Sequence, residues 1–239
     1  MIIVKTFFSI LFASLFIILT KIKIIPILGT NMKFSVSVFF GPTISSFIGI
    51  VPGTFSIIFA HLFGLLIGFY KIKSITSYLT FLPIITAGIY FAKMFKGDRK
   101  MIIPSIACMI LFVLHPIGRT VWYYSLFWTI PIFIALFKSK TDVLLKIKSF
   151  KVYAYALGSA YVDHAIGSII YLYYLNIPAK FWTQAIPLTF IERLIIAGGI
   201  TLSYFSVRFA IKSLKELAVP IAVVIREREK EKEVTVHEK

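Results

Sequence analysis

The stretch "YALGSAYVDHAIGSIIYLYYL", residues 155–175, is an apolar run long enough to cross a bilayer as a helix. It carries Asp163 and His164 side by side near its centre. A charged residue at the centre of a bilayer costs at least about 2.5–3.5 kcal/mol on insertion scales. Such a residue is expected where it binds a ligand or pairs with a neighbouring helix, so the stretch predicts both a membrane helix and a site.

The composition of the whole chain agrees with a membrane setting. Of the 239 residues, 59% are hydrophobic and 15% are charged, and the mean hydropathy is +0.90. Soluble domains are nearer half apolar and a quarter charged. The aromatic content of 16% suits a protein that crosses two membrane interfaces. We therefore predict a multi-pass protein of the cell membrane.

Successive apolar runs predict an all-α, polytopic transmembrane bundle of about eight helices. The turn between the two spans of the second run is expected at "VPG", 51–53, and the double run 101–137 is expected to divide at "HPIGR", 115–119. Re-entrant segments around Gly41-Pro42 and His115-Pro116 would reduce the number to six or seven. The predicted spans are about 3–20, two within 34–70, about 75–92, two within 101–137, about 152–176 and about 185–212.

Charge sets the predicted domains and orientation. Residues 1–215 form the transmembrane domain, and residues 216–239 form a charged cytoplasmic tail, either a solvated helix or disordered. The net charge is +16, and the loops 93–100 and 138–151 together hold nine Lys and Arg. Because basic loops stay on the cytoplasmic side, both termini are expected to be cytoplasmic. The expected partner of this charge is membrane lipid, not nucleic acid.

Asp163 and Glu192 are the only acidic residues in the predicted membrane segments. Asp163 has Ser159 and Gly167 at helical spacing on its own face, so a neighbouring helix or a ligand can come close. Glu192 is followed by Arg193, and adjacent helical residues point about 100° apart. We therefore expect one of the two to form a cross-helix pair with Asp163 or His164.

These residues predict a pocket for a small solute between helices, in the middle to outer half of the bilayer. The two carboxylates would bind a cationic or hydrogen-bonding ligand, or carry a proton, and an arginine would bind an anionic group. Trp122 is expected at the pocket mouth, with Tyr123, Tyr124, Tyr171 and Trp182. The predicted ligand-binding residues are Asp163, His164, Glu192, Arg193, His61, His115, Arg119 and Trp122.

The same residues are compatible with two other functions. The intramembrane charges could be structural pairs that lock the helices of an assembly or scaffold protein. The histidines and carboxylates could also gather around a divalent metal in a membrane enzyme. The sequence has no HExxH motif, no GxSxG elbow and no P-loop. We therefore predict a non-enzyme without metal or cofactor that cannot power transport with its own ATPase.

The stretch "FGPTISSFIGIVPG", residues 40–53, resembles the substrate-binding S components of energy-coupling-factor transporters, which have a Gly-Pro break followed by small residues. The resemblance implies a compact helical body, a loop after the first helix that helps to cover a ligand, and a transmembrane coupling subunit with ATPases as partner. Ser9 and Ala13 resemble the small-residue surface that such subunits present to that partner. The second half, with "YVDHAIGS", resembles uncharacterised prokaryotic membrane proteins.

Overall fold

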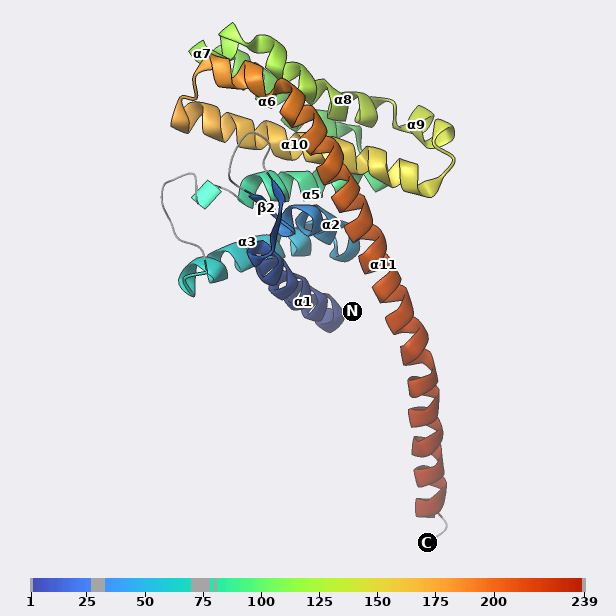
Figure 1. The fold of residues 1–239 in the computed structure, drawn as a ribbon. Coiled ribbons are helices and arrows are strands. Elements are labelled where there is room, and N and C mark those ends of the chain that lie inside the picture. Colours follow the sequence, from blue (N-terminus) through green and yellow to red (C-terminus); the bar gives the residue numbers. More distant parts are fainter. Residues whose placement is uncertain (1, 27–32, 70–77, 80, 238–239) are drawn as a thin grey trace. The chain divides into compact units, whose positions relative to one another are not determined.

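The computed structural model describes residues 2–26, 33–69, 78–79 and 81–237, and it shows an all-α chain with one short β-hairpin (Figure 1). The hairpin pairs β1 (Lys23–Pro26) with β2 (Lys33–Ser35) in antiparallel fashion. The helices in the first part of the chain are α1 (Ile2–Lys21), α2 (Ser37–Ile48), α3 (Ile50–Leu66), α5 (Phe81–Lys96) and the 3-10 helix η1 (Arg99–Ile102). The remaining helices are α6 (Ile103–Leu114), α7 (Pro116–Thr120), the 3-10 helix η2 (Trp122–Trp128), α8 (Thr129–Leu136), α9 (Lys138–Leu144), α10 (Lys148–Leu175) and α11 (Ala179–His237).

The chain divides into two compact units, Met1–Thr201 and Leu202–Lys239, and the division falls inside α11. The second unit is the remainder of this helix, which continues to His237, so the charged tail is helical. The boundary predicted between residues 215 and 216 stays a prediction.

Helices α5 and α10 form the middle of the first unit (Figure 1). On one side, α2 packs on α5, and α1 and α3 pack on α2 and on each other. On the other side, α6, η2 and α8 pack against α10. Tyr90 of α5 connects the two sides, because its hydroxyl donates a 2.8 Å hydrogen bond to the carbonyl oxygen of Pro131 in α8.

The break between α2 and α3 lies at Gly49, and the predicted turn at 51–53 is wrong by a few residues. Gly49 has a φ of 100°, a conformation that residues with a side chain rarely adopt. Pro52 falls in the first turn of α3, where a missing N–H costs nothing. Pro42 lies inside α2, which continues through the Gly41-Pro42 pair.

The run 101–137 does divide at the "HPIGR" motif, as predicted, because α6 ends at Leu114 and α7 begins at Pro116. Its second half is not one span but three short elements, α7, η2 and α8. Among the described residues, only Ala179–Leu214 is both long and apolar enough to cross a bilayer. The shorter apolar helices found are Thr6–Lys21, Ser37–Ile48, Ile50–Leu66 and Trp122–Leu136.

Ala13 is only 3% exposed, because α1 packs against α2 and α3 of the same chain. The prediction that Ala13 lies on a surface for a partner is therefore wrong.

The predicted helix 75–92 corresponds to α5, which begins at Phe81, and residues 75–77 lie outside the described residues.

Asp142 holds α9 against the start of α10. It accepts a 2.5 Å hydrogen bond from Lys138 Nζ and another from the Tyr155 hydroxyl, and Lys151 Nζ lies 3.9 Å from its carboxylate. Partial burial acts to raise the pKa of the Asp142 carboxyl, but the hydrogen bonds from Lys138 and Tyr155 and the lysine charges lower this pKa below its ordinary value.

We expect the contribution of Asp142 to stability to depend on pH. Because the pKa of Asp142 is lowered by folding, the contribution is present above the ordinary carboxyl pKa and is lost as the pH falls through the folded pKa. Asp142→Asn should therefore lower the free energy of unfolding at pH 7 by about 0.5–1 kcal/mol, and the difference from wild type should shrink between pH 5 and pH 3. Thermal unfolding of both proteins between pH 7 and pH 3 measures this difference in stability. Glu216→Gln, in an exposed pair with Lys212, is the control, and a difference for Asp142→Asn that does not change with pH would contradict the prediction.

Candidate functional site

An ion cluster lies between α10 and α11, at three of the residues predicted from the sequence to form the site: Asp163, Glu192 and Arg193. Arg193 Nη1 is 3.3 Å from Asp163 Oδ2, and Arg193 Nη2 is 3.6 Å from Glu192 Oε2. The exposed fraction of the side chain is 5% for Arg193, 10% for Glu192 and 24% for Asp163. The cross-helix pair predicted from the sequence is present in the structure as the pair of Asp163 with Arg193.

The β-hairpin adds an aromatic face to this cluster. The guanidinium carbon of Arg193 lies 5.5 Å from the ring centroid of Phe34, in β2. This distance is within the range of a cation–π interaction. Phe34 thus helps to shield the guanidinium from water, which strengthens its attraction to the carboxylates.

Asp163 keeps part of its hydrogen-bonding capacity. Arg193 contacts Oδ2, whereas Oδ1 makes no hydrogen bond within the described part of the chain. Because a carboxylate can accept bonds on both oxygens, and because this side chain is about a quarter exposed, Oδ1 can accept a bond from a molecule outside the chain.

Three polar side chains from two elements contact His164: Trp128 and Tyr124 of η2 and Ser168 of α10. Trp128 Nε1 donates to its Nδ1 at 3.2 Å, and its Nε2 lies 3.0 Å from the Tyr124 hydroxyl and 3.4 Å from Ser168 Oγ. The Tyr124 hydroxyl lies 3.0 Å from Thr189 Oγ1, on α11.

These contacts define the tautomer of His164. An indole N–H only donates, so Nδ1 of His164 must be the acceptor and Nε2 must carry the proton. Nε2–H then donates to the oxygen of Tyr124, and the Tyr124 hydroxyl donates to Thr189. Thr189 lies one turn before Arg193 on α11, so this directed chain fixes the register in which Arg193 meets Asp163.

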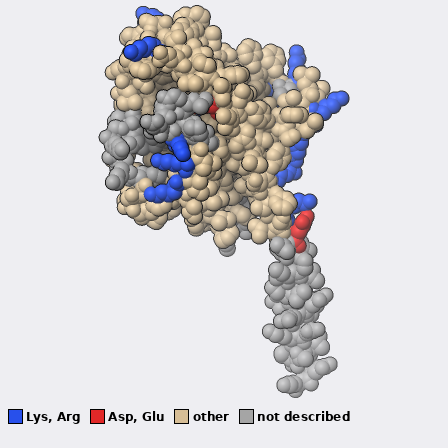
Figure 2. Space-filling view, viewed as in Figure 1, with Lys and Arg blue, Asp and Glu red and all other residues tan. Residues whose placement is uncertain are grey.

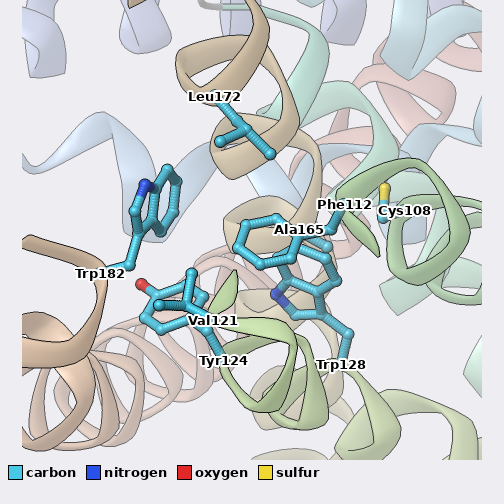
Figure 3. Packing of buried hydrophobic residues seen from close by; sticks show 8 residues of the cluster. All are labelled: Cys108, Phe112, Val121, Tyr124, Trp128, Ala165, Leu172 and Trp182. Atoms are coloured by element: carbon cyan, nitrogen blue, oxygen red, sulfur yellow. The ribbon is translucent and has the colours of Figure 1, made fainter. Parts of the chain in front are cut away.

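An aromatic cluster supports the network (Figure 3). The ring centroid of Tyr124 lies 5.0 Å from that of Trp182 and 5.9 Å from that of Phe112. The ring centroids of Trp128 and Phe112 lie 5.2 Å apart. Tyr124 and Trp182 are buried, 3% and 5% exposed, so the prediction that they line a pocket mouth is wrong. The cluster comprises Cys108, Phe112, Val121, Tyr124, Trp128, Ala165, Leu172 and Trp182.

Two buried donors next to the ion cluster make no hydrogen bond to any described residue: the Tyr161 hydroxyl and Arg193 Nε. The Tyr161 ring is stacked on the Phe127 ring, with 5.7 Å between the ring centroids. Buried donors usually have a partner, so this part of the chain has hydrogen-bonding capacity left for a further group.

The other predicted site residues lie elsewhere. His61 is on α3, and its ring packs 5.1 Å from Phe81. His115 caps α7, where its Nδ1 accepts a bond from the Ile117 amide at 3.3 Å. The His115 ring lies 4.9 Å from Tyr173, about 15 Å further along α10 than Asp163.

Arg119 belongs to α7, the helix that His115 caps, and Trp122 begins η2 with 53% of its surface exposed. Among the described residues, no group of three His, Cys, Asp or Glu side chains is close enough together to hold a metal ion. A role in ligand binding for His61, His115, Arg119 and Trp122 stays a prediction.

Several members of the site were not predicted from the sequence. Trp128 and Thr189 were not considered, and Phe34 was placed in a membrane span. A signal for Trp128 existed in "WYYSLFW", residues 122–128, because an indole in an apolar run needs a hydrogen-bond acceptor when buried.

The chain is 31% identical over 140 residues to an uncharacterised protein of Methanocaldococcus jannaschii, and the match covers 56% of this chain and 45% of that protein. The chain thus matches less than half the length of this relative. No protein-family model matches the chain, and no solved structure does.

Proposed function

We propose that this chain is a multi-pass protein of the cell membrane that binds a small solute at Asp163 and Arg193, as a solute-binding or transport subunit. The site residues are Asp163, Arg193 and Glu192, with His164 as the residue that positions them. The proposed body is a polytopic bundle of six to eight membrane segments with both termini in the cytoplasm. In this arrangement, helices too short to cross the bilayer alone lie in pairs within it and cross it together, as α2 does with α3.

Exposed apolar faces support a membrane location. One face of α3 exposes large apolar side chains, with Phe55 at 66%, Phe59 at 58% and Leu66 at 84%. Soluble monomers rarely expose continuous apolar patches of this kind. Charged side chains are sparse on the face of the first unit that Figure 2 shows, as expected for a surface in contact with lipid.

The single observation that carries the solute site is Oδ1 of Asp163, a carboxylate oxygen that accepts no hydrogen bond from any described residue. Arg193 contacts Oδ2 of Asp163 and balances the charge of the carboxylate. Within the part of the chain that the structure describes, Oδ1 makes no hydrogen bond and is left to accept one. A ligand with a cationic or hydrogen-bond-donating group fits this oxygen. An acceptor on the same ligand would suit the buried donors Tyr161 and Arg193 Nε.

A thermal-shift screen of small solutes, with amines and amino acids first, tests the proposal. A solute that raises the melting temperature of the wild type should lose this effect in Asp163→Asn, because the amide weakens acceptance from a cationic group. Glu216→Gln is the matched control, because Glu216 is an exposed acid outside the site, and it should respond as wild type does. A solute that still stabilises Asp163→Asn would contradict the assignment of Asp163.

The pair of Asp163 with Arg193 also favours a second candidate, a non-catalytic assembly or scaffold protein. In that case the pair only joins α10 to α11. Asp163→Asn would then lower the melting temperature strongly, and no solute would stabilise the wild type. If the chain is a coupling-factor subunit, as its resemblance suggests, it should copurify with a transmembrane subunit and ATPases through a surface other than Ala13.

A further inference from the structure

The connection from α9 to α10 exposes large apolar side chains and lysines together. Val143 is 70% exposed, Leu144 78%, Ile147 59% and Phe150 57%. Lys140, Lys146 and Lys148 are exposed in the same stretch. We call these seven residues the basic-apolar patch. Such a mixture is typical of a segment that lies in the interface of a membrane, with its apolar side chains among lipid chains and its cations among headgroups.

The lysines of the patch have no carboxylate partner among the described residues. The one acid of the segment, Asp142, is already used by Lys138, Lys151 and Tyr155. The Asp142 contacts hold α9 on α10, so the three lysines of the patch project from a fixed support.

A second basic segment, the turn after α5, extends the surface of the basic-apolar patch. A methyl group placed on Gly97 would lie 3.5 Å from Cδ of Lys138, so the turn after α5 abuts the start of α9. Asp98 in this turn pairs with Lys93 at 2.8 Å and accepts a bond from the Lys100 amide. Figure 2 shows blue side chains along the margin where Figure 1 places α9 and the start of α10.

We propose that the basic-apolar patch binds the headgroups of anionic phospholipids. The ammonium groups of Lys140, Lys146 and Lys148 contact lipid phosphates, and the apolar side chains of the patch insert among the acyl chains. The exposed aliphatic side chains Val143, Leu144 and Ile147 favour lipid over a nucleic acid or an acidic peptide as the occupant, because aliphatic side chains gain most from insertion among acyl chains. The proposal rests on the membrane location given above, and not on the solute site.

Lipid titration of the full-length protein in neutral detergent tests this inference. Bound lipid is counted by native mass spectrometry while phosphatidylglycerol or phosphatidylcholine is added. The wild type should bind phosphatidylglycerol much more tightly, and high salt should reduce the difference. The variant Lys140→Gln/Lys146→Gln/Lys148→Gln should lose affinity for phosphatidylglycerol on the order of a hundredfold.

The control variant is Lys23→Gln/Lys33→Gln/Lys180→Gln, which removes three exposed lysines from other parts of the chain. It should bind phosphatidylglycerol as wild type does. Equal affinity of the wild type for the two lipids, an unchanged affinity in the patch variant or an equal loss in the control would each overturn the proposal. Circular dichroism checks that both variants keep their helical content.

The outcome is separate from that of the solute screen. Asp163→Asn should bind phosphatidylglycerol as wild type does, whatever it does to solute binding. A protein that proves soluble without detergent would contradict the membrane location and this inference together. A protein that needs detergent but does not distinguish the two lipids would contradict this inference alone.

Discussion

Arg193→Met is expected to lower the free energy of unfolding by about 3–5 kcal/mol, because it removes a guanidinium that contacts both carboxylates of a largely buried cluster. Methionine fills a similar volume, so the loss reports on charge more than on packing. The charges of Asp163 and Glu192 would remain in a buried site without this partner. At a few degrees per kcal/mol for a chain of this size, the melting temperature should fall by about 10 °C.

Thermal unfolding in detergent measures this effect. Arg208→Met is the matched control, because Arg208 is an exposed arginine on the same helix, and its melting temperature should stay near that of wild type. The double variant Asp163→Asn/Arg193→Met should recover part of the loss, because one of the remaining charges is gone. An Arg193→Met variant as stable as wild type would mean that the ion cluster adds nothing to the fold.

Gly118→Ala is expected to have the second largest effect on stability. Gly118 lies in α7, and a methyl group at this position would overlap the backbone carbonyl oxygen of Phe112 and come within 3.2 Å of Leu172. Because a backbone atom cannot move aside as a side chain can, α7 must shift against α6. Overpacking of this kind costs about 1–3 kcal/mol, and occasionally more.

A shift at α7 would also reach the site. The Phe112 ring packs against Tyr124 and Trp128, which hold His164. Unfolding of Gly118→Ala is compared with that of Gly167→Ala, where the nearest heavy atom to the new methyl is Cγ of Pro83 at 3.9 Å. Gly167→Ala should match or exceed wild type, since alanine favours a helix by about 1 kcal/mol over glycine. Equal melting temperatures for the two variants would contradict the close approach at Gly118.

The sequence predicted those features that depend on short stretches. The helical class follows from the apolar runs, and the break at residues 115–119 follows from proline and glycine. The pairing of Asp163 with a residue of the last helix follows from the cost of a charge in an apolar run. The turn near residue 50 was misplaced because Gly49 and Pro52 both interrupt helices, and only Gly49 adopts a positive φ.

The support of His164 was not predictable in this way. Its partners Tyr124 and Trp128 lie 40 and 36 residues earlier, in a 3-10 helix, and Thr189 lies 65 residues after Tyr124. No periodic pattern connects such distant positions. The burial of Tyr124 and Trp182 likewise depends on how α6, α10 and η2 pack, and interfacial aromatics look the same in a sequence.

The indole at one end of the hydrogen-bond chain decides what His164 can do for its neighbour. A side chain passes a proton along only if it can accept on one side and donate on the other, and the Trp128 N–H has no acceptor to offer. The series of hydrogen bonds therefore ends at Trp128, whose indole N–H donates to Nδ1 of His164. A proton taken up by Asp163 must be exchanged with the surroundings of that carboxylate, so His164 holds its position in the hydrogen-bond network and does not relay protons.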